Sequence, residues 1–173
     1  ITLSRRRSYP HMKKVILITG IGGDIAQGVA TIVREKRPGV YLIGVDVHDQ
    51  HGGHLFVYQF ALVPSAGSLN YLDAIKAIVR KYSIDMVIPM SEPELAVASP
   101  FSELAPGVQW ITPGEQVVRV GLDKLETMRA LSGLGIPVPW TEPVSKGRPI
   151  SYPCILKNRL GSGSRAVFTV AND

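Results

Sequence analysis

Apolar residues from Val15 onward alternate between two patterns. Short continuous runs are typical of strands buried on both faces of a sheet, whereas apolar positions three or four residues apart are typical of a helix with one buried face. Strand runs are predicted at 15–19, 40–45, 55–63, 85–89 and 108–111. Because helical segments separate these runs, we predict an α/β fold, a Rossmann-like parallel sheet with helices on both faces.

The helices between these strands are predicted from apolar residues that share a face. In the first helix, Ala26 and Ala30 lie beside a stripe of larger residues, namely Ile25, Val29, Ile32 and Val33. In the second helix, the predicted stripe consists of Leu69, Leu72, Ile75, Ile78 and Tyr82. A third segment, 92–104, has a helical pattern until Pro100 interrupts it.

The pattern changes after the fifth strand, where two helix starts are predicted. Thr112 has the position of a cap with Glu115 as its capping-box partner, and Asp123 caps the next helix with Glu126 three residues later. The buried stripe of that second helix is predicted to be Leu125, Met128, Leu131 and Leu134. Gly135 and the prolines that follow it end this helix.

Prolines gather between residues 137 and 153, which indicates a linker or a domain boundary. Two short apolar runs, 154–157 and 166–170, then flank a loop rich in glycine and serine. A β-hairpin is the expected form. The length of the chain allows one full domain and part of a second.

Composition excludes several classes of protein. The chain has 173 residues, of which 45% are hydrophobic and 19% charged, as in ordinary globular proteins. No apolar run approaches the roughly 20 residues that span a bilayer, so no membrane partner is expected. Cys154 is the single cysteine, which makes a disulfide within the chain impossible and favours the reducing cytoplasm.

Three of the positive charges behind the net charge of +5 belong to Arg5, Arg6 and Arg7. A basic arm of this kind can bind nucleic acid. However, residues 1–11 have no periodicity and precede Met12, a natural start residue. We therefore interpret this segment as a disordered arm or tag remnant and expect no nucleic-acid partner.

A glycine-rich turn follows the first predicted strand. Its spacing fails the strict dinucleotide fingerprint because Ile25 occupies the third glycine position, but it fits the looser pattern of short-chain dehydrogenases. Asp46 follows the second strand, where an acidic residue can accept a ribose hydroxyl. Gly22 and Gly23 either let backbone N–H groups face a substrate at the helix N-terminus or form only a tight turn.

A lysine and a flexible loop follow near the end of the chain. Lys157 ends a predicted strand, and the loop after it contains Gly161, Ser162, Gly163 and Ser164. A lysine supplies positive charge for phosphate oxygens, and such a loop supplies backbone N–H donors. The motif is not a Walker A loop, because no G-K-[ST] occurs, and a solvated hairpin turn is the alternative. Lys124, taken by itself, is a surface lysine.

Acidic and histidine residues supply two weaker candidates. Glu92 and Glu94 follow a strand end, where they could meet a substrate ammonium or hydroxyl group, or only complement a helix dipole. One loop gathers four groups that can ligate metals, namely His48, Asp49, His51 and His54. Glycines make this loop flexible and no supporting second shell can be argued, so we expect no metal there.

Four stretches together resemble the carbamoyl-phosphate synthase-like branch of the ATP-grasp superfamily. They are VILITGIGGDIAQG at 15–28, SIDMVIPMSEPEL at 83–95, DKLETMRALSGLGIPVP at 123–139 and PCILKNRLGSGSRAVF at 153–168. Their order and separations are those of the family, and the third and fourth together are specific. The resemblance extends from Met12 to the end of the chain.

The resemblance implies a pre-ATP-grasp domain at 12–120, usually without a dinucleotide, and the truncated start of an ATP-grasp domain at 121–173. Lys124 and Lys157 match lysines that contact nucleotide phosphates, and residues 161–164 match the loop over the β- and γ-phosphates. Asn158 replaces a usual proline and Ala166 a common glycine. These departures make the loop a poorer match than Lys157.

The same resemblance implies an enzyme that phosphorylates a carboxylate with ATP and lets an amine or similar nucleophile displace the phosphate. ATP and Mg²⁺ are the implied cofactors, small-molecule carboxylates and nucleophiles the implied partners, and a homo-oligomer is possible. In this family the Mg²⁺ ligands lie further along than Asp173, so the chain alone is expected to be inactive.

Two alternatives to a ligase remain open. A nicotinamide-dependent short-chain dehydrogenase needs a Tyr-x-x-x-Lys pair, and this spacing occurs only at Tyr9 and Lys13, before the first strand. A non-enzymatic Rossmann-like module that binds a small ligand is the other alternative.

Overall fold

The computed structural model describes residues 14–97, 105–161 and 166–172. The chain divides into two compact units, Ile1–Thr112 and Pro113–Asp173. Helix α5 (Glu115–Leu122) therefore belongs to the second unit. The assignment of the two segments to particular domain families stays a prediction.

The first unit contains a five-stranded parallel sheet, which confirms the predicted fold class. Its strand order is β3-β2-β1-β4-β5, and every neighbouring pair is parallel. The strands are β1 (Lys14–Ile18), β2 (Val40–Asp46), β3 (Gln59–Leu62), β4 (Met86–Ile88) and β5 (Gln109–Trp110).

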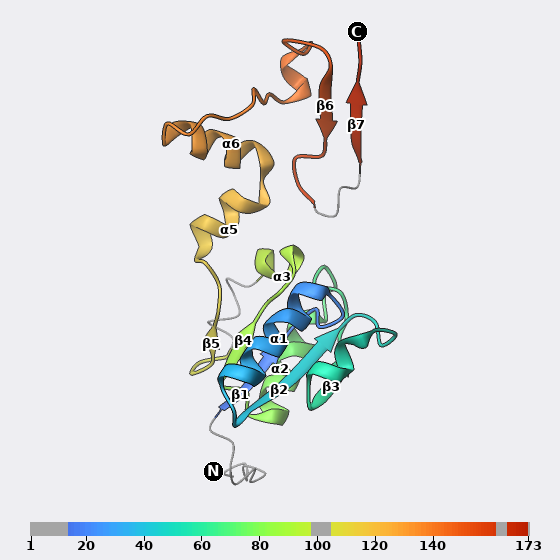
Figure 1. The fold of residues 1–173 in the computed structure, drawn as a ribbon, viewed down its shortest axis with the longest axis vertical. Helices are drawn as coiled ribbons and strands as arrows, with labels where there is room; N and C mark the ends of the chain where they lie inside the picture. The colour runs from blue at the N-terminus through green and yellow to red at the C-terminus, as the bar shows by residue number, and fades with distance from the viewer. Residues whose placement is uncertain (1–13, 98–104, 162–165, 173) are drawn as a thin grey trace. The chain divides into compact units, whose positions relative to one another are not determined.

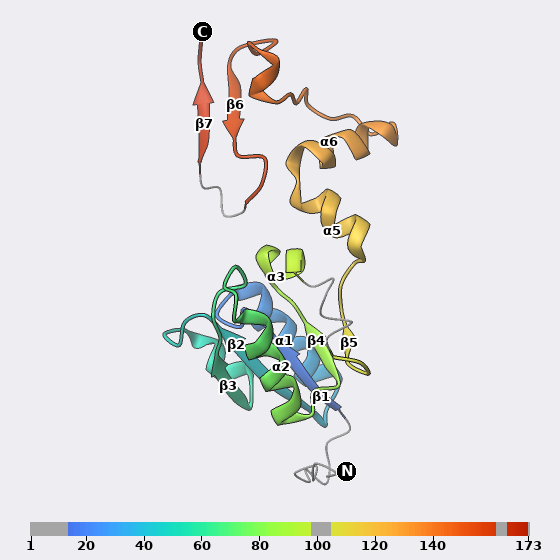
Figure 2. The same ribbon diagram turned by 180° about the vertical axis from the view of Figure 1, so that it is seen from behind.

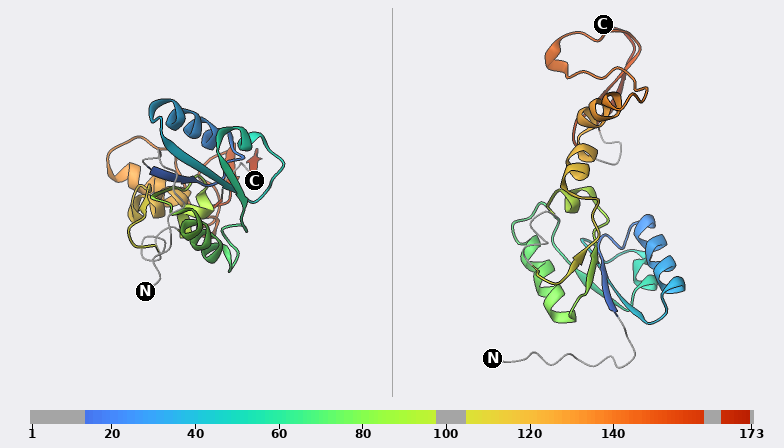
Figure 3. Two further views of the ribbon diagram at one scale, coloured as in Figure 1. Left: turned by 90° about the horizontal axis from the view of Figure 1, so that it is seen from below. Right: turned by 90° about the vertical axis from the view of Figure 1, so that its left-hand side faces the viewer.

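Helices α1 (Asp24–Lys36) and α2 (Tyr71–Tyr82) cover opposite faces of this sheet, as Figures 1, 2 and 3 show. Successive residues of β1 face the two sides in turn, so Ile16 and Ile18 pack with α1 whereas Leu17 packs with α2. The described part of this unit also contains two shorter helices, the 3-10 helix η1 (Gly52–Phe56) and α3 (Glu92–Val97).

The face that α1 buries corrects the sequence prediction. Ala26 and Ala30 are buried, whereas Ile25 and Ile32 are exposed, Ile25 by 71%. Alanine side chains are short, so the helix backbone can lie close to the sheet when they face it, and dense interior packing favours that approach. The larger isoleucines consequently face outward.

Helix α2 buries most of its predicted stripe, with one correction at its start. Ile75 and Ile78 are buried as predicted, but Leu69 precedes the helix and is exposed. Tyr71 takes the buried position in the first turn instead. At the other end, Ser83 adopts a left-handed conformation with φ of 52°.

The second unit combines helices with a hairpin. The antiparallel pairing of β6 with β7 confirms the predicted hairpin, and Lys157 lies opposite Val167 in it. The elements of this unit are α5 (Glu115–Leu122), α6 (Lys124–Gly133), the 3-10 helix η2 (Val144–Lys146), β6 (Cys154–Lys157) and β7 (Val167–Val170).

Of the two predicted helix caps, one is wrong and one is confirmed. Thr112 does not cap α5, because Ile111 N still donates to Val87 O at 2.9 Å and the chain turns into the helix only at Gly114. Asp123 caps α6 as predicted, accepting hydrogen bonds from Leu125 N at 3.0 Å and Glu126 N at 3.2 Å.

The predicted stripe of α6 is buried at one end only. Leu125 is buried and Met128 and Leu131 are half-buried, but Leu134 is exposed. Leu134 follows the last helical residue, where the chain already turns toward Gly135 with its φ of 75°. No helix in the described part of the chain is long and apolar enough to cross a membrane.

Candidate functional site

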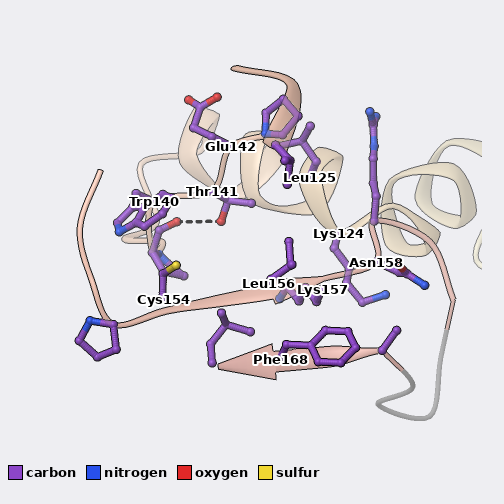
Figure 4. Close-up of a pocket in the computed structure, with 17 residues that line it drawn as sticks. Lys124, Leu125, Trp140, Thr141, Glu142, Cys154, Leu156, Lys157, Asn158 and Phe168 are labelled. Atoms are coloured by element: carbon purple, nitrogen blue, oxygen red, sulfur yellow. Dashed lines mark hydrogen bonds between the residues drawn. The ribbon is translucent and has the colours of Figure 1, made fainter. Parts of the chain in front are cut away.

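A pocket of about 700 Å³ in the second unit brings together the two predicted lysines. Its walls come from the start of α6, the segment 139–144, and both strands of the hairpin. Figure 4 shows Lys124 and Lys157 at one end of the pocket, with Trp140 and Cys154 at the other. Phe168 of β7 contributes an aromatic ring to the wall. A pocket with two cations and an aromatic surface suits a ligand that is anionic at one end and flat and apolar at the other.

Lys124 is fixed at both its backbone and its side chain. Its backbone N–H donates to Arg159 O at 3.1 Å, and its Nζ donates to Gly161 O at 2.5 Å. The ammonium group therefore points toward the chain that leaves β6, rather than into solvent. This directed position is what the sequence could not distinguish from an ordinary surface lysine.

Lys157 occupies the last position of β6, opposite Val167. Strand pairing fixes its backbone, while the side chain borders the pocket. Within the described residues, Lys157 forms no ion pair. Its positive charge is thus available to an anionic ligand.

The loop after Lys157 is described only at its ends. Gly161 has φ of 103°, a conformation that L side chains rarely adopt. Ser162, Gly163 and Ser164 lie outside the described residues, and their assignment to a phosphate loop stays a prediction. Ala166, at a position where the resemblance predicts glycine, has φ of 55° in the left-handed region. The requirement of this position for positive φ explains why glycine suits it better.

Arg159 also lines the pocket, although no sequence motif predicts a role for it. Its Nε lies 2.7 Å from each oxygen of Asp123, and its Nη2 lies 2.6 Å from Asp123 Oδ2. Hydrogen bonding by Arg159, aided by the N–H groups of Glu126 and Leu125, lowers the pKa of Asp123 to about 2. The partners are 36 residues apart, so only the fold reveals the pair.

The glycine turn of the first unit borders a second pocket, of about 580 Å³, and is held in place by Asp46 and His51. Gly22 N donates to Asp46 Oδ2 at 2.8 Å, and Val47 N donates to Asp46 Oδ1 at 2.7 Å. A Cβ atom on Gly22 would lie only 2.7 Å from His51 Cδ2, so the imidazole covers this glycine closely. Asp46, the candidate ribose acceptor, thus fixes the turn through its carboxylate, and whether Gly22 and Gly23 face a substrate stays a prediction.

The two glutamates after β4 have different surroundings. Glu92 is exposed, whereas Glu94 is only 6% exposed and its carboxylate accepts hydrogen bonds from protein groups. The donors are Thr19 Oγ1 at 2.6 Å, Tyr71 OH at 2.7 Å, Ser91 Oγ at 2.8 Å and Ser91 N at 3.1 Å. Burial, together with the Glu94 charge, raises the pKa of Tyr71. This arrangement gives Glu94 a structural role at the carboxyl edge of the sheet, which position in the sequence did not reveal.

The histidine loop does not assemble a metal site. No group of three or more metal-ligating side chains occurs among the residues that the structure describes. His51 Nδ1 accepts a hydrogen bond from Gly53 N at 3.0 Å, and His54 Nε2 lies 2.8 Å from Asp49 O. The rings of His51 and His54 stack with centroids 5.0 Å apart. These contacts form a local packing cluster.

No protein-family model and no curated protein matches the sequence. Solved structures do match the fold. An N5-carboxyaminoimidazole ribonucleotide synthetase, crystallised as its ADP complex, matches with a TM-score of 0.68 and 18% identity, over 94% of this chain and 42% of that chain. The fold is that of the N-terminal region of ATP-grasp enzymes.

Two further structures agree with this match. The biotin carboxylase domain of 2-oxoglutarate carboxylase from Hydrogenobacter thermophilus, in complex with ADP, Mg²⁺ and bicarbonate, has a TM-score of 0.66 and 14% identity over 92% of this chain and 38% of that chain. An L-amino acid ligase from Bacillus licheniformis has a TM-score of 0.62 and 17% identity over 93% and 40% of the respective chains. This chain thus spans about two fifths of the length of each of these structures.

Proposed function

We propose that the chain is the N-terminal part of an ATP-dependent ligase that joins a carboxylate to an amine or a similar nucleophile through an acyl phosphate. The observation that carries the proposal is the convergence of Lys124 and Lys157 on one pocket from two rigid elements, the start of α6 and the end of β6. The fold shared with two enzymes solved with ADP supports the same reading.

The residues present fit a nucleotide as far as its phosphates are concerned. Lys157 offers an ammonium group without an ion-pair partner among the described residues, and Lys124 offers one that is held only by a backbone carbonyl. Two fixed positive charges can orient a polyphosphate and offset the charge that develops as a phosphoryl group moves.

Mg²⁺ would supply further charge neutralisation between the phosphates in such a reaction. The described residues contain no cluster of three or more acidic, histidine or cysteine side chains that could hold it. We therefore assign no metal ligand among the described residues.

The test of this proposal is product analysis with the whole protein to which the chain belongs. A panel of carboxylic acids and bicarbonate would be offered with ATP, Mg²⁺ and amines, and the nucleotide product identified by chromatography. We expect ADP and inorganic phosphate, formed only when a carboxylate is present and strongly reduced in Lys157→Ala. Formation of AMP and pyrophosphate would instead show an acyl adenylate and contradict the proposal.

A further inference from the structure

We propose that Arg159 is a positioning residue for the phosphate end of the pocket, which acts through Asp123 to fix Lys124 and Gly161 without touching the nucleotide itself. The inference rests on the proposed function for its ligand. Its structural part stands on the contacts between the chain that leaves β6 and the start of α6.

These contacts form a clamp made of Asp123, Lys124, Arg159 and Gly161. One side of the clamp is the ion pair, in which the Arg159 guanidinium meets Asp123 at 2.6–2.7 Å. The other side consists of two hydrogen bonds donated by Lys124, from its backbone N to Arg159 O and from its Nζ to Gly161 O. The segment after β6 therefore donates hydrogen bonds to the start of α6 through the Arg159 side chain, and it accepts hydrogen bonds from Lys124 through its backbone carbonyl groups.

The clamp has a rigid anchor because Asp123 belongs to the end of a helix. The carboxylate accepts hydrogen bonds from Leu125 N and Glu126 N, so its position is set by α6. A guanidinium binds a carboxylate in a fixed planar geometry, and this geometry transfers the position of Asp123 to residue 159. The backbone of Arg159 and Gly161 then determines where the ammonium group of Lys124 lies.

The donors of Arg159 point toward carboxylates, which argues for positioning rather than for a direct phosphate contact. Its Nε binds Asp123, and its Nη2 lies between Asp123 and Glu126, 3.3 Å from Glu126 Oε1. A phosphate contact through Nε or Nη2 would have to displace these carboxylates first. Lys157, by contrast, has no competing ion pair within the described residues.

Arg129 provides a matched control on the same helix. Its side chain is 55% exposed against 52% for Arg159, and it also pairs with Glu126, at 2.8 Å. Arg129→Gln removes the same charge as Arg159→Gln from the same neighbourhood. Its ion pair lies within α6, so the clamp stays intact.

The main experiment is a double-mutant cycle in the whole protein, with affinity for a non-hydrolysable ATP analogue and Mg²⁺ measured by calorimetry. Asp123→Asn keeps a good helix cap but loses the ionic partner of Arg159. We expect Arg159→Gln and Asp123→Asn each to weaken binding about 10-fold, and the double variant to bind no more weakly than either. Arg159→Lys should recover part of the loss, and Arg129→Gln should bind like the wild type.

Two outcomes of this cycle would overturn the inference. If Arg159→Gln binds as tightly as the wild type, Arg159 has no role in the site. If Arg159→Gln binds weakly while Asp123→Asn binds as well as or better than the wild type, Arg159 contacts the phosphates directly. Asp123→Asn removes a negative charge from the pocket, so electrostatics alone would strengthen the binding of an anionic nucleotide. The positioning role instead requires Asp123→Asn to weaken binding, which separates the two explanations.

A second readout needs no nucleotide. Titration of the Asp123 carboxyl group by NMR in residues 1–173 should give a pKa of about 2, and Arg159→Gln should raise it toward 3.8, whereas Arg129→Gln should not. An ordinary pKa in the wild type would show that the clamp is absent and overturn the inference. A low pKa combined with a whole protein that binds no nucleotide would contradict the proposed function while supporting the clamp.

Discussion

The two units differ in how they bury apolar side chains. In the first unit, both faces of the central strands are enclosed, and Ile43 of β2 is 0% exposed. In the second unit, Leu125 is the one buried hydrophobic side chain among the described residues, and Ile155 of β6 is 58% exposed. The first unit therefore has a core of its own, whereas the second holds its site mainly by polar contacts such as Asp123 with Arg159.

The largest expected effect is a direct contrast between two isoleucines in strands. Ile43→Ala should lower the free energy of unfolding of the first unit by about 2–5 kcal/mol, because it opens a cavity in a closed core. Ile155→Ala, its matched control in the second unit, should change stability by about 0.5 kcal/mol or less. Urea unfolding followed by circular dichroism measures both. Equal losses would contradict the difference in burial between the two units.

A smaller effect is expected at the buried polar cluster of the first unit. Glu94→Gln should cost about 1–3 kcal/mol, because its amide N–H groups would face the hydroxyl and N–H donors that now surround the carboxylate. Glu92→Gln, at an exposed position two residues away, is the control and should be nearly neutral. If the Glu94 variant is as stable as the control, Glu94 is free for a substrate after all.

The two units should lose stability at opposite ends of the pH range, the first unit at high pH and the second at low pH. Because folding raises the pKa of Tyr71, its contribution is complete below the unfolded value near 10 and is lost as the pH rises beyond it. Because folding lowers the pKa of Asp123 to about 2, its contribution is present above 3.8 and is lost as the pH falls toward 2. The unfolding midpoint of the wild type should therefore be lower at pH 10.5 than at pH 8, and this decrease should be smaller in Tyr71→Phe.

The smallest effect concerns the backbone of the hairpin. Ala166→Gly should stabilise the second unit by at most about 1 kcal/mol, because glycine accepts the positive φ of 55° without steric strain but loses more entropy on folding. Ala171→Gly, outside the strand and without positive φ, is the control and should not stabilise. Thermal unfolding would show the difference, and destabilisation by Ala166→Gly would contradict the strain argument.

The sequence predicts the parts of this structure that depend on local pattern. The run VILIT becomes β1, and Asp123 with the following helix pattern becomes a capped α6. Both features need only near neighbours along the chain, as sequence patterns require.

Features that depend on distant residues escape such reasoning. Ile25 has the apolarity of a buried residue, yet the closeness of α1 to the sheet selects Ala26 instead. Glu94 looks like a helix-terminal charge until the fold brings Thr19 and Tyr71 to it. Arg159 has no signature at all, because its role depends on a carboxylate 36 residues earlier. Contact with a distant partner, rather than residue type, decides each of these cases.

If the second unit carries the phosphate-binding lysines, these lysines should determine the affinity of the whole protein for a non-hydrolysable ATP analogue with Mg²⁺, measured by calorimetry. Lys157→Ala should weaken binding about 10- to 100-fold, the loss of a charge-assisted hydrogen bond worth about 1.5–3 kcal/mol, and Lys124→Ala somewhat less. Lys76→Ala, which removes a lysine paired with Asp73 in the first unit, should leave the affinity unchanged. If Lys157→Ala binds the analogue as tightly as the wild type, the phosphate site is not at the end of β6, and a non-enzymatic ligand-binding module becomes the better account.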